Sequence, residues 1–115
     1  MTPGRVVILT VGALAAIAAT SASGLAAMSA QGFGAQMADA MTRMHQAMMA
    51  PQSGDPDRDF AAMMIPHHQG AVEMAQAELA YGKDERLRRL AQAIIVEQNQ
   101  EIAVMRQALA ERKKP

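Results

Sequence analysis

The stretch FAAMMIPHHQGAVEM, residues 60–74, decides how the rest of this chain is interpreted. At about 100° per residue on a helix, its thioethers and imidazoles gather on one side. That side comprises Phe60, Met63, Met64, His67, Ala71, Met74 and Glu78, with His68 at its edge. The pattern indicates either half of a metal site or a core stripe, because methionine fills irregular gaps and a buried histidine is usually hydrogen-bonded.

The first 30 residues are typical of an export signal. Arg5 precedes an unbroken apolar run over residues 6–19, and small residues continue to Ala30. The run is shorter than the roughly 20 residues that span a bilayer, which favours a cleaved signal peptide over an uncleaved anchor. We therefore expect a periplasmic or otherwise exported protein, held at the inner membrane if the signal stays attached.

The remaining chain suffices for one small domain without disulfides. We divide it into a Met-rich first helix and turn at residues 31–56 and a two-helix core at residues 57–115. Formal net charge is +0 and no cysteine is present, so neither nucleic-acid binding nor a disulfide framework is indicated. A domain of this size then needs helix packing, a homo-oligomer or a ligand for stability.

Methionine is concentrated along a predicted first helix from Phe33 to Ala50. Flexible methionine specifies packing poorly, so a seam built of it favours thioether ligation over a purely structural role. The candidate ligands on this helix are Met41, Met44, His45 and Met48, on composition alone. The turn PQSGDP at residues 51–56 ends the helix.

Two further helices follow. Asp55 is a good N-cap for the second, within which Pro66 predicts a kink. Gly82 suits a left-handed position just past its end. Asp84 caps a third helix predicted to reach Lys113, and the three together predict an all-α, small antiparallel bundle.

Polar residues interrupt the apolar stripe of the third helix. Gln98 and Glu101 lie near its centre and Glu97 flanks it. Burying a carboxylate alone is costly, so Glu101 must meet a partner such as His67, or the bundle must be open there as a solvated seam or an oligomer face.

The sequence gives no support for an enzyme. Di-iron bundles use a Glu-x-x-His motif on each of two helices, and this chain has none. A thiol nucleophile, a phosphate-binding glycine loop and an HExxH motif are also absent from the sequence.

From Asp57 to Leu109 the chain resembles the family known as domain of unknown function 305, which includes periplasmic copper-binding proteins. The resemblance lies in Asp57, Phe60, the MIPHH motif ending at His68, and the run LAQAIIVEQNQEIAVM from Leu90 to Met105. It implies a ferritin-like helical bundle, export, and copper or silver binding. The ligands that it implies are Met64, His67, His68, Met74, Glu101 and Met105, with Met63 as a neighbour. The chain departs from the family pattern at Lys83, Asp84 and Ala108.

We therefore expect an exported copper-binding protein that serves periplasmic buffering, trafficking or tolerance. Thioether and imidazole ligands favour Cu(I), with Cu(II) as a second oxidation state and silver as a competitor. Copper transporters or other periplasmic copper proteins are the expected partners, together with a second copy of the chain. The alternative is a structural or interaction module whose Met-rich groove binds a partner without metal.

Overall fold

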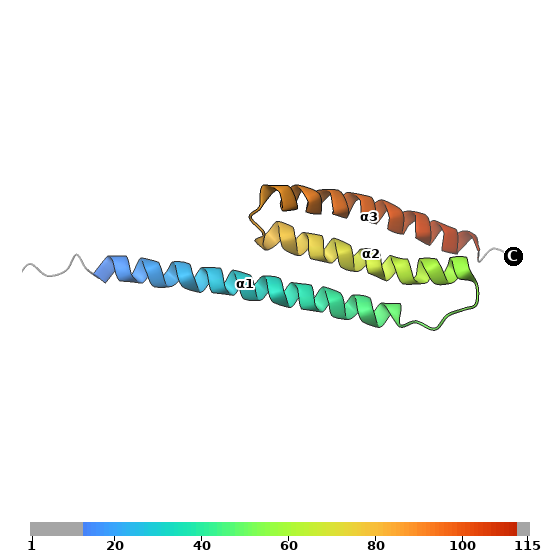
Figure 1. Cartoon of the computed structure of the whole chain (residues 1–115), viewed down its shortest axis with the longest axis horizontal. Helices are drawn as coiled ribbons and strands as arrows, with labels where there is room; N and C mark the ends of the chain where they lie inside the picture. Colours follow the sequence, from blue (N-terminus) through green and yellow to red (C-terminus); the bar gives the residue numbers. More distant parts are fainter. Residues whose placement is uncertain (1–12, 113–115) are drawn as a thin grey trace, which may run out of the picture.

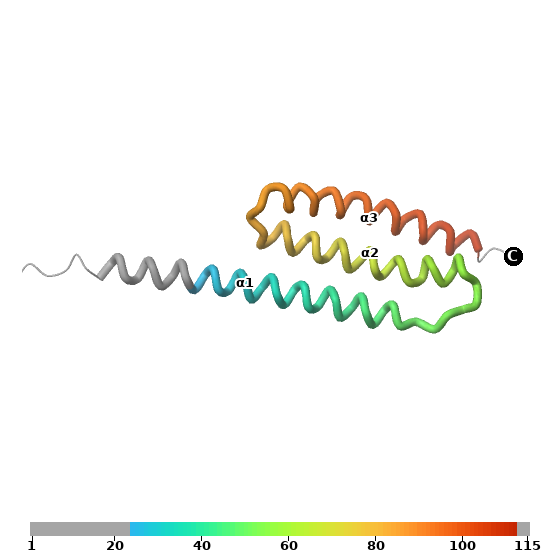
Figure 2. The backbone as a smooth tube through the Cα atoms, viewed as in Figure 1, coloured from blue at the N-terminus to red at the C-terminus, as the bar shows by residue number. Residues whose placement is uncertain are grey.

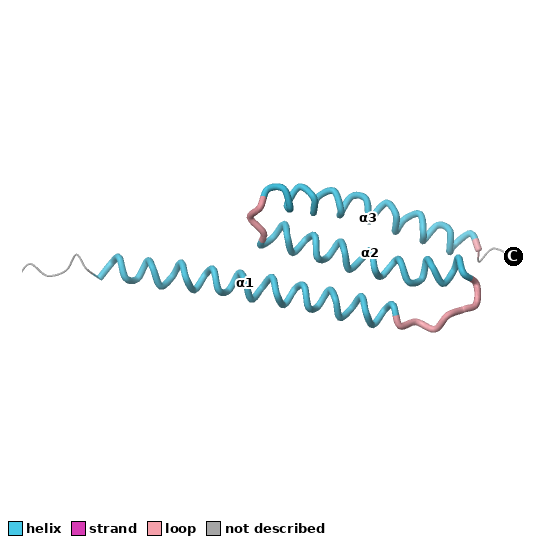
Figure 3. Tube along the Cα trace, in the orientation of Figure 1, coloured by secondary structure: helices cyan, strands magenta, loops and turns pink. Residues whose placement is uncertain are grey.

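The chain forms three α-helices joined by two short loops (Figure 3). The computed structural model describes residues 13–112, with side chains from residue 24 onwards. The helices are α1 (Ala13–Met48), α2 (Pro56–Tyr81) and α3 (Glu85–Glu111). The predicted fold class, a small all-α antiparallel bundle, is confirmed.

The three helices lie side by side with α2 in the middle (Figure 1). Both α1 and α3 pack on α2, and in the described part of the chain they do not contact each other. Each broad side of this layer is therefore left without a further helix.

The first helix begins earlier than expected. It starts at Ala13 instead of Phe33, because alanine and other small residues of high helix propensity continue the helix back into the predicted signal segment. Among the described residues, no helix combines the length and the apolarity required to cross a bilayer. Part of the predicted signal lies outside the described residues, shown in grey in Figure 2, so the signal peptide and the anchor remain predictions.

Both predicted N-caps are confirmed. The Asp55 carboxylate accepts the backbone N–H of Asp57 at 3.1 Å, and Asp84 accepts that of Arg86 at 2.9 Å. These bonds satisfy backbone donors that have no partner inside the helix.

The expectation for Gly82 is wrong. Its φ of −71° and ψ of 152° are extended, not left-handed. An added Cβ would meet only the carboxylate end of the flexible Glu78 side chain. The helix α2 continues through Pro66 without a break.

Small residues bring α1 and α2 close together. Met44 is 9% exposed and packs on Gly70, where an added Cβ would lie 2.9 Å from the methionine sulfur. Beside this contact, the Arg43 guanidinium pairs with the Glu73 carboxylate at 2.7 Å.

The contact between α2 and α3 also uses small side chains. The buried residues are Ala61, Val72 and Ala75 on α2 and Ala91 and Ile102 on α3.

Ion pairs join the start of α2 to the end of α3. Arg112 pairs with Asp55 at 2.8 Å and with Asp57.

Candidate metal centre

A groove between α2 and α3 brings four of the predicted ligands together. Its volume is about 740 Å³, and it is lined by Phe60, Met64, His68, Gln98, Gln100, Glu101, Val104 and Met105. The antiparallel hairpin causes this convergence, because the start of α2 lies beside the end of α3. Met64, His68, Glu101 and Met105 therefore meet as one set.

His68 and Glu101 form the polar contact of the groove. His68 is 8% exposed, and its Nε2 lies 2.6 Å from Oε2 of Glu101. An ionised carboxylate only accepts hydrogen bonds, so Nε2 carries the proton in this pair. In the neutral imidazole, Nδ1 then holds a lone pair, and this buried atom has no hydrogen-bond partner.

The structure separates the two predicted histidine ligands. His67, which the sequence offered as one partner for Glu101, is exposed and lies outside the groove lining. Its ring centroid lies 5.9 Å from that of His68. The third helix packs on the side of α2 that carries Ala61, Val72 and Ala75, and His68 lies closer to that side.

Met74 and Met63 do not join this set. Met74 lines a separate groove of about 280 Å³ with Leu87, Leu90 and Ile94. It is ten residues along α2 from Met64, or about 15 Å at 1.5 Å per residue. Met63 is 40% exposed and is absent from the lining of both grooves.

The candidate ligands on α1 also lie elsewhere. Met44 is buried against α2, whereas Met41 is 38% exposed. His45 is exposed and Met48 is half-buried. All four lie outside the groove between α2 and α3.

Oxygen and nitrogen ligands alone do not form a site in the described part of the chain. Within it, no three histidine, aspartate or glutamate side chains gather closely enough to hold a metal ion. A site in the groove would need sulfur from Met64 and Met105 beside the His68 imidazole. That donor set suits a soft cation better than Mg²⁺ or Ca²⁺, which prefer oxygen.

Gln98 is part of the groove but was not among the predicted site residues. Its Oε1 atom is buried and has no hydrogen-bond partner. The signal in the sequence was its polarity within an apolar stripe, for which an open seam was one of the alternatives. Phe60 and Val104 complete the groove wall, and nothing in their spacing distinguished them from ordinary packing residues.

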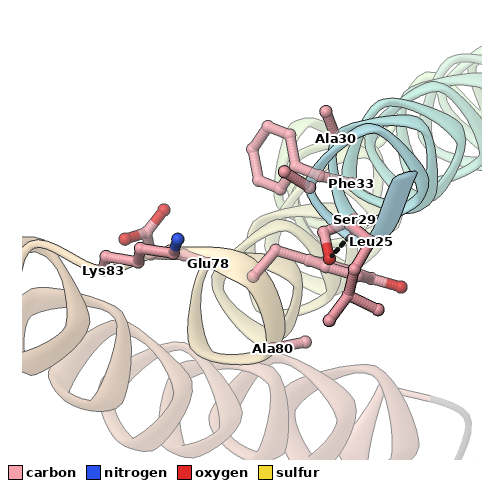
Figure 4. A pocket seen from close by; sticks show the side chains of 10 residues that line it. Leu25, Ser29, Ala30, Phe33, Glu78, Ala80 and Lys83 are labelled. Atoms are coloured by element: carbon pink, nitrogen blue, oxygen red, sulfur yellow. Dashed lines mark hydrogen bonds between the residues drawn. The ribbon is translucent and has the colours of Figure 1, made fainter. Parts of the chain in front are cut away.

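A slightly larger cavity lies away from these residues. It has a volume of about 790 Å³ and lies between α1 and the end of α2, as Figure 4 shows. Its α1 wall includes Leu25 and Ser29, where the Ser29 hydroxyl donates to the Leu25 carbonyl at 3.0 Å. These two residues belong to the predicted signal segment, and no histidine or methionine lines the cavity. We therefore place the candidate site in the smaller groove.

The comparisons with known proteins agree with the resemblance seen in the sequence. The family model described as "Domain of unknown function (DUF305)" matches residues 12–109, which include all of α1 and α2 and all but the last two residues of α3. No curated protein matches the chain. Because the match extends over far more than half of the sequence, this chain belongs to the family of the domain of unknown function DUF305.

Proposed function

We propose that this chain is an exported copper-binding protein that buffers, carries or sequesters Cu(I), and that it is not an enzyme. The observation that carries the proposal is the His68 imidazole. One of its nitrogens bonds to Glu101, and the other is buried without a hydrogen-bond partner in a residue that lines the same groove as Met64 and Met105.

The chemistry of these groups favours copper in its reduced state. Thioether sulfur binds Cu(I) and Ag(I) without losing a proton, and it does not form disulfides in an oxidising compartment. Glu101 would hold the His68 ring in one orientation and raise the basicity of the ligating nitrogen. Cu(II) would depend more on the histidines, including the exposed His67 and His45.

The groove suits exchange of metal with a partner. Phe60 is 61% exposed and Val104 is 66% exposed, so one side of the groove is open to solvent. A periplasmic copper transporter or another copper protein could approach the ligands from that side. Buffering or delivery fits this open site better than permanent storage does.

Equilibrium dialysis of the metal-free protein against Cu(I) under reducing conditions tests the proposal. We expect binding at micromolar free metal that His68→Gln weakens at least tenfold. The control is His45→Gln, which removes an exposed imidazole outside the groove and should leave that binding unchanged. Absence of binding by the unmodified chain, or equal binding by the two variants, would contradict the proposal.

A second candidate is an interaction module that uses the same groove without metal. The exposed Phe60 and Val104 favour it, because apolar groups at a groove mouth are typical of protein contacts. This candidate predicts that volume-conserving methionine-to-leucine changes in the groove leave its activity intact. Copper binding predicts that they do not.

A further inference from the structure

An apolar stripe on α3 is not covered by another helix in the described part of the chain. Leu87, Leu90 and Val104 are 52%, 55% and 66% exposed, and α2 is the only helix that α3 contacts in the described part of the chain. The far side of α3 is polar, with Gln92, Asn99 and Arg106 all exposed. Exposed apolar groups are therefore concentrated on one side of the helix.

The adjacent side of α2 continues the same surface. Met74 shares a groove with Leu90, and Phe60 shares the next groove with Val104. Both helices therefore contribute to one apolar side of the layer. We call it the open face and define it by Phe60, Met63, Met74, Leu87, Leu90 and Val104.

The spacing along α3 is that of a helix that packs on another helix. Steps of three and four residues alternate through Leu87, Leu90, Ile94, Glu97, Glu101, Val104, Ala108 and Glu111. This is the heptad pattern of coiled coils and four-helix bundles. The stripe is nearly symmetric about Asn99, so an antiparallel second copy would place apolar residues opposite apolar residues on both sides of its centre.

Size also fits a second copy. The open face is about 39 Å long, from 26 residues at 1.5 Å each. With two helices about 10 Å wide it offers roughly 800 Å² per copy, which is the usual share of a stable interface.

We propose that two copies of this chain pair through their open faces, with α3 antiparallel to the partner's α3, and so complete a four-helix bundle. Leu90 faces the partner's Ala108, and Ile94 faces the partner's Val104. Nearest the two-fold axis, Glu97 faces the partner's Glu101, and the carboxylate of Glu101 is bonded to His68 within its own copy. The pairing does not require metal, and it covers the groove mouth at Phe60 and Val104, so exchange of metal with another protein takes place from the separated copies.

The pairing also completes a second set of soft ligands. The stripe on α2 is nearly symmetric about Gln69, so the partner's Met74 comes within one helical turn of Met63 and His67. Within one chain Met63 and His67 are neighbours four residues apart on α2, and Met74 lies further along the helix, so the three meet only across the axis. This second site rests on the proposed copper function, whereas the dimer does not.

Light scattering on the full-length, metal-free chain tests the pairing. We expect a dimer that Leu90→Glu converts to a monomer without loss of helical circular dichroism. Val96→Glu is the matched control, because Val96 is 57% exposed but lies about 120° around α3 from Leu90. A monomeric unmodified chain, or dissociation by both variants alike, overturns the pairing.

Disulfide cross-linking tests the direction of the pairing in a chain that has no cysteine of its own. A mixture of Leu90→Cys and Ala108→Cys chains should form a cross-linked heterodimer, and neither variant alone should cross-link. The two positions are about 27 Å apart along the helix, so a parallel pair would instead cross-link each variant with itself. That result, or no cross-linking at all, contradicts the antiparallel dimer.

Leu90 lies outside the groove of His68. Measuring copper binding by Leu90→Glu therefore separates failure of the dimer from failure of the proposed function.

Discussion

At the scale of single residues, the account depends on the different surroundings of the two nitrogens of His68. Glu101 binds one at 2.6 Å, and the other is buried without a partner. A buried polar atom without a hydrogen bond costs free energy, and a bound metal would remove that cost. The adjacent His67 is exposed and does not line the groove.

The thioethers of the groove should matter for copper more than for folding. We expect the double change Met64→Leu and Met105→Leu to lower Cu(I) affinity at least tenfold. It should alter the free energy of unfolding by less than about 1.5 kcal/mol per site, because leucine conserves the volume. Competition titration with a Cu(I) chelator and urea unfolding measure the two quantities. The control is Met44→Leu, in the contact between α1 and α2, which should leave Cu(I) affinity unchanged. An equal loss of Cu(I) affinity in the double variant and the control would contradict the assignment of Met64 and Met105 as ligands.

Gly70 should be indispensable to the contact between α1 and α2. A Cβ at this position would lie 2.9 Å from the Met44 sulfur and 3.1 Å from its Cβ. We expect Gly70→Ala to destabilise the protein by about 1–3 kcal/mol despite the better helix propensity of alanine. Gly34→Ala is the control: nothing lies within 4 Å of its added Cβ, so it should stabilise α1 by roughly 0.5–1 kcal/mol. Urea unfolding measures both, and a gain in stability for Gly70→Ala would contradict the packing.

At the scale of the elements, the N-caps of α2 and α3 were predictable and the helix partners were not. Asp55 and Asp84 are recognised from local sequence alone, because capping involves only the next three residues. The side of α2 that faces α3 depends on packing between distant segments. Local sequence therefore predicted a partner for Glu101 without showing which of the two histidines faces α3. The end of α2 at Tyr81 was predictable, but the extended conformation of Gly82 was not.

Capping should make helix stability sensitive to acid. The hydrogen bond from the Arg86 side chain, followed by bonds from backbone N–H groups, lowers the pKa of Asp84 from 3.8 to about 2. Hydrogen bonds from Ser53 likewise lower the pKa of Asp59. A carboxyl group with a lowered pKa stabilises the fold above its unfolded pKa, and the contribution is lost as the pH falls through its folded pKa.

We therefore expect the thermal midpoint to fall as the pH decreases from about 4 to about 2. Circular dichroism melts at several pH values measure this. Asp84→Asn keeps a capping oxygen but does not titrate, so its midpoint should change less over the same range. An equally steep acid transition in Asp84→Asn would exclude Asp84 as a source of the pH dependence.

At the scale of the whole molecule, three helices in one layer place the candidate groove entirely on the α2–α3 hairpin. Local sequence predicted that the helices exist, and composition predicted that methionine would line a site. Neither could show that the α1 methionines lie apart from the groove, since this depends on how α1 packs on α2. The start of α1 at Ala13 could not be predicted from the sequence, because its first residues also match an export signal.

Removal of the predicted signal should leave the copper site intact. The groove uses residues between Phe60 and Met105, and no residue before Gln31 lines it. A chain that begins at Gln31 should therefore bind Cu(I) with the same affinity as the full chain, within about twofold. Parallel dialysis of the two proteins checks this, with circular dichroism to confirm helix content. A large loss of affinity in the shorter folded chain would show that the first 30 residues contribute to the site.

The central claim is that one imidazole and thioether sulfur from two helices converge on a soft metal ion. X-ray absorption at the copper edge of the Cu(I)-loaded protein tests it most directly. The account predicts a ligand shell of both sulfur and nitrogen, with the sulfur contribution reduced when Met64 and Met105 are both leucine. A shell of only oxygen and nitrogen, or a sulfur signal unchanged in that double variant, would contradict it.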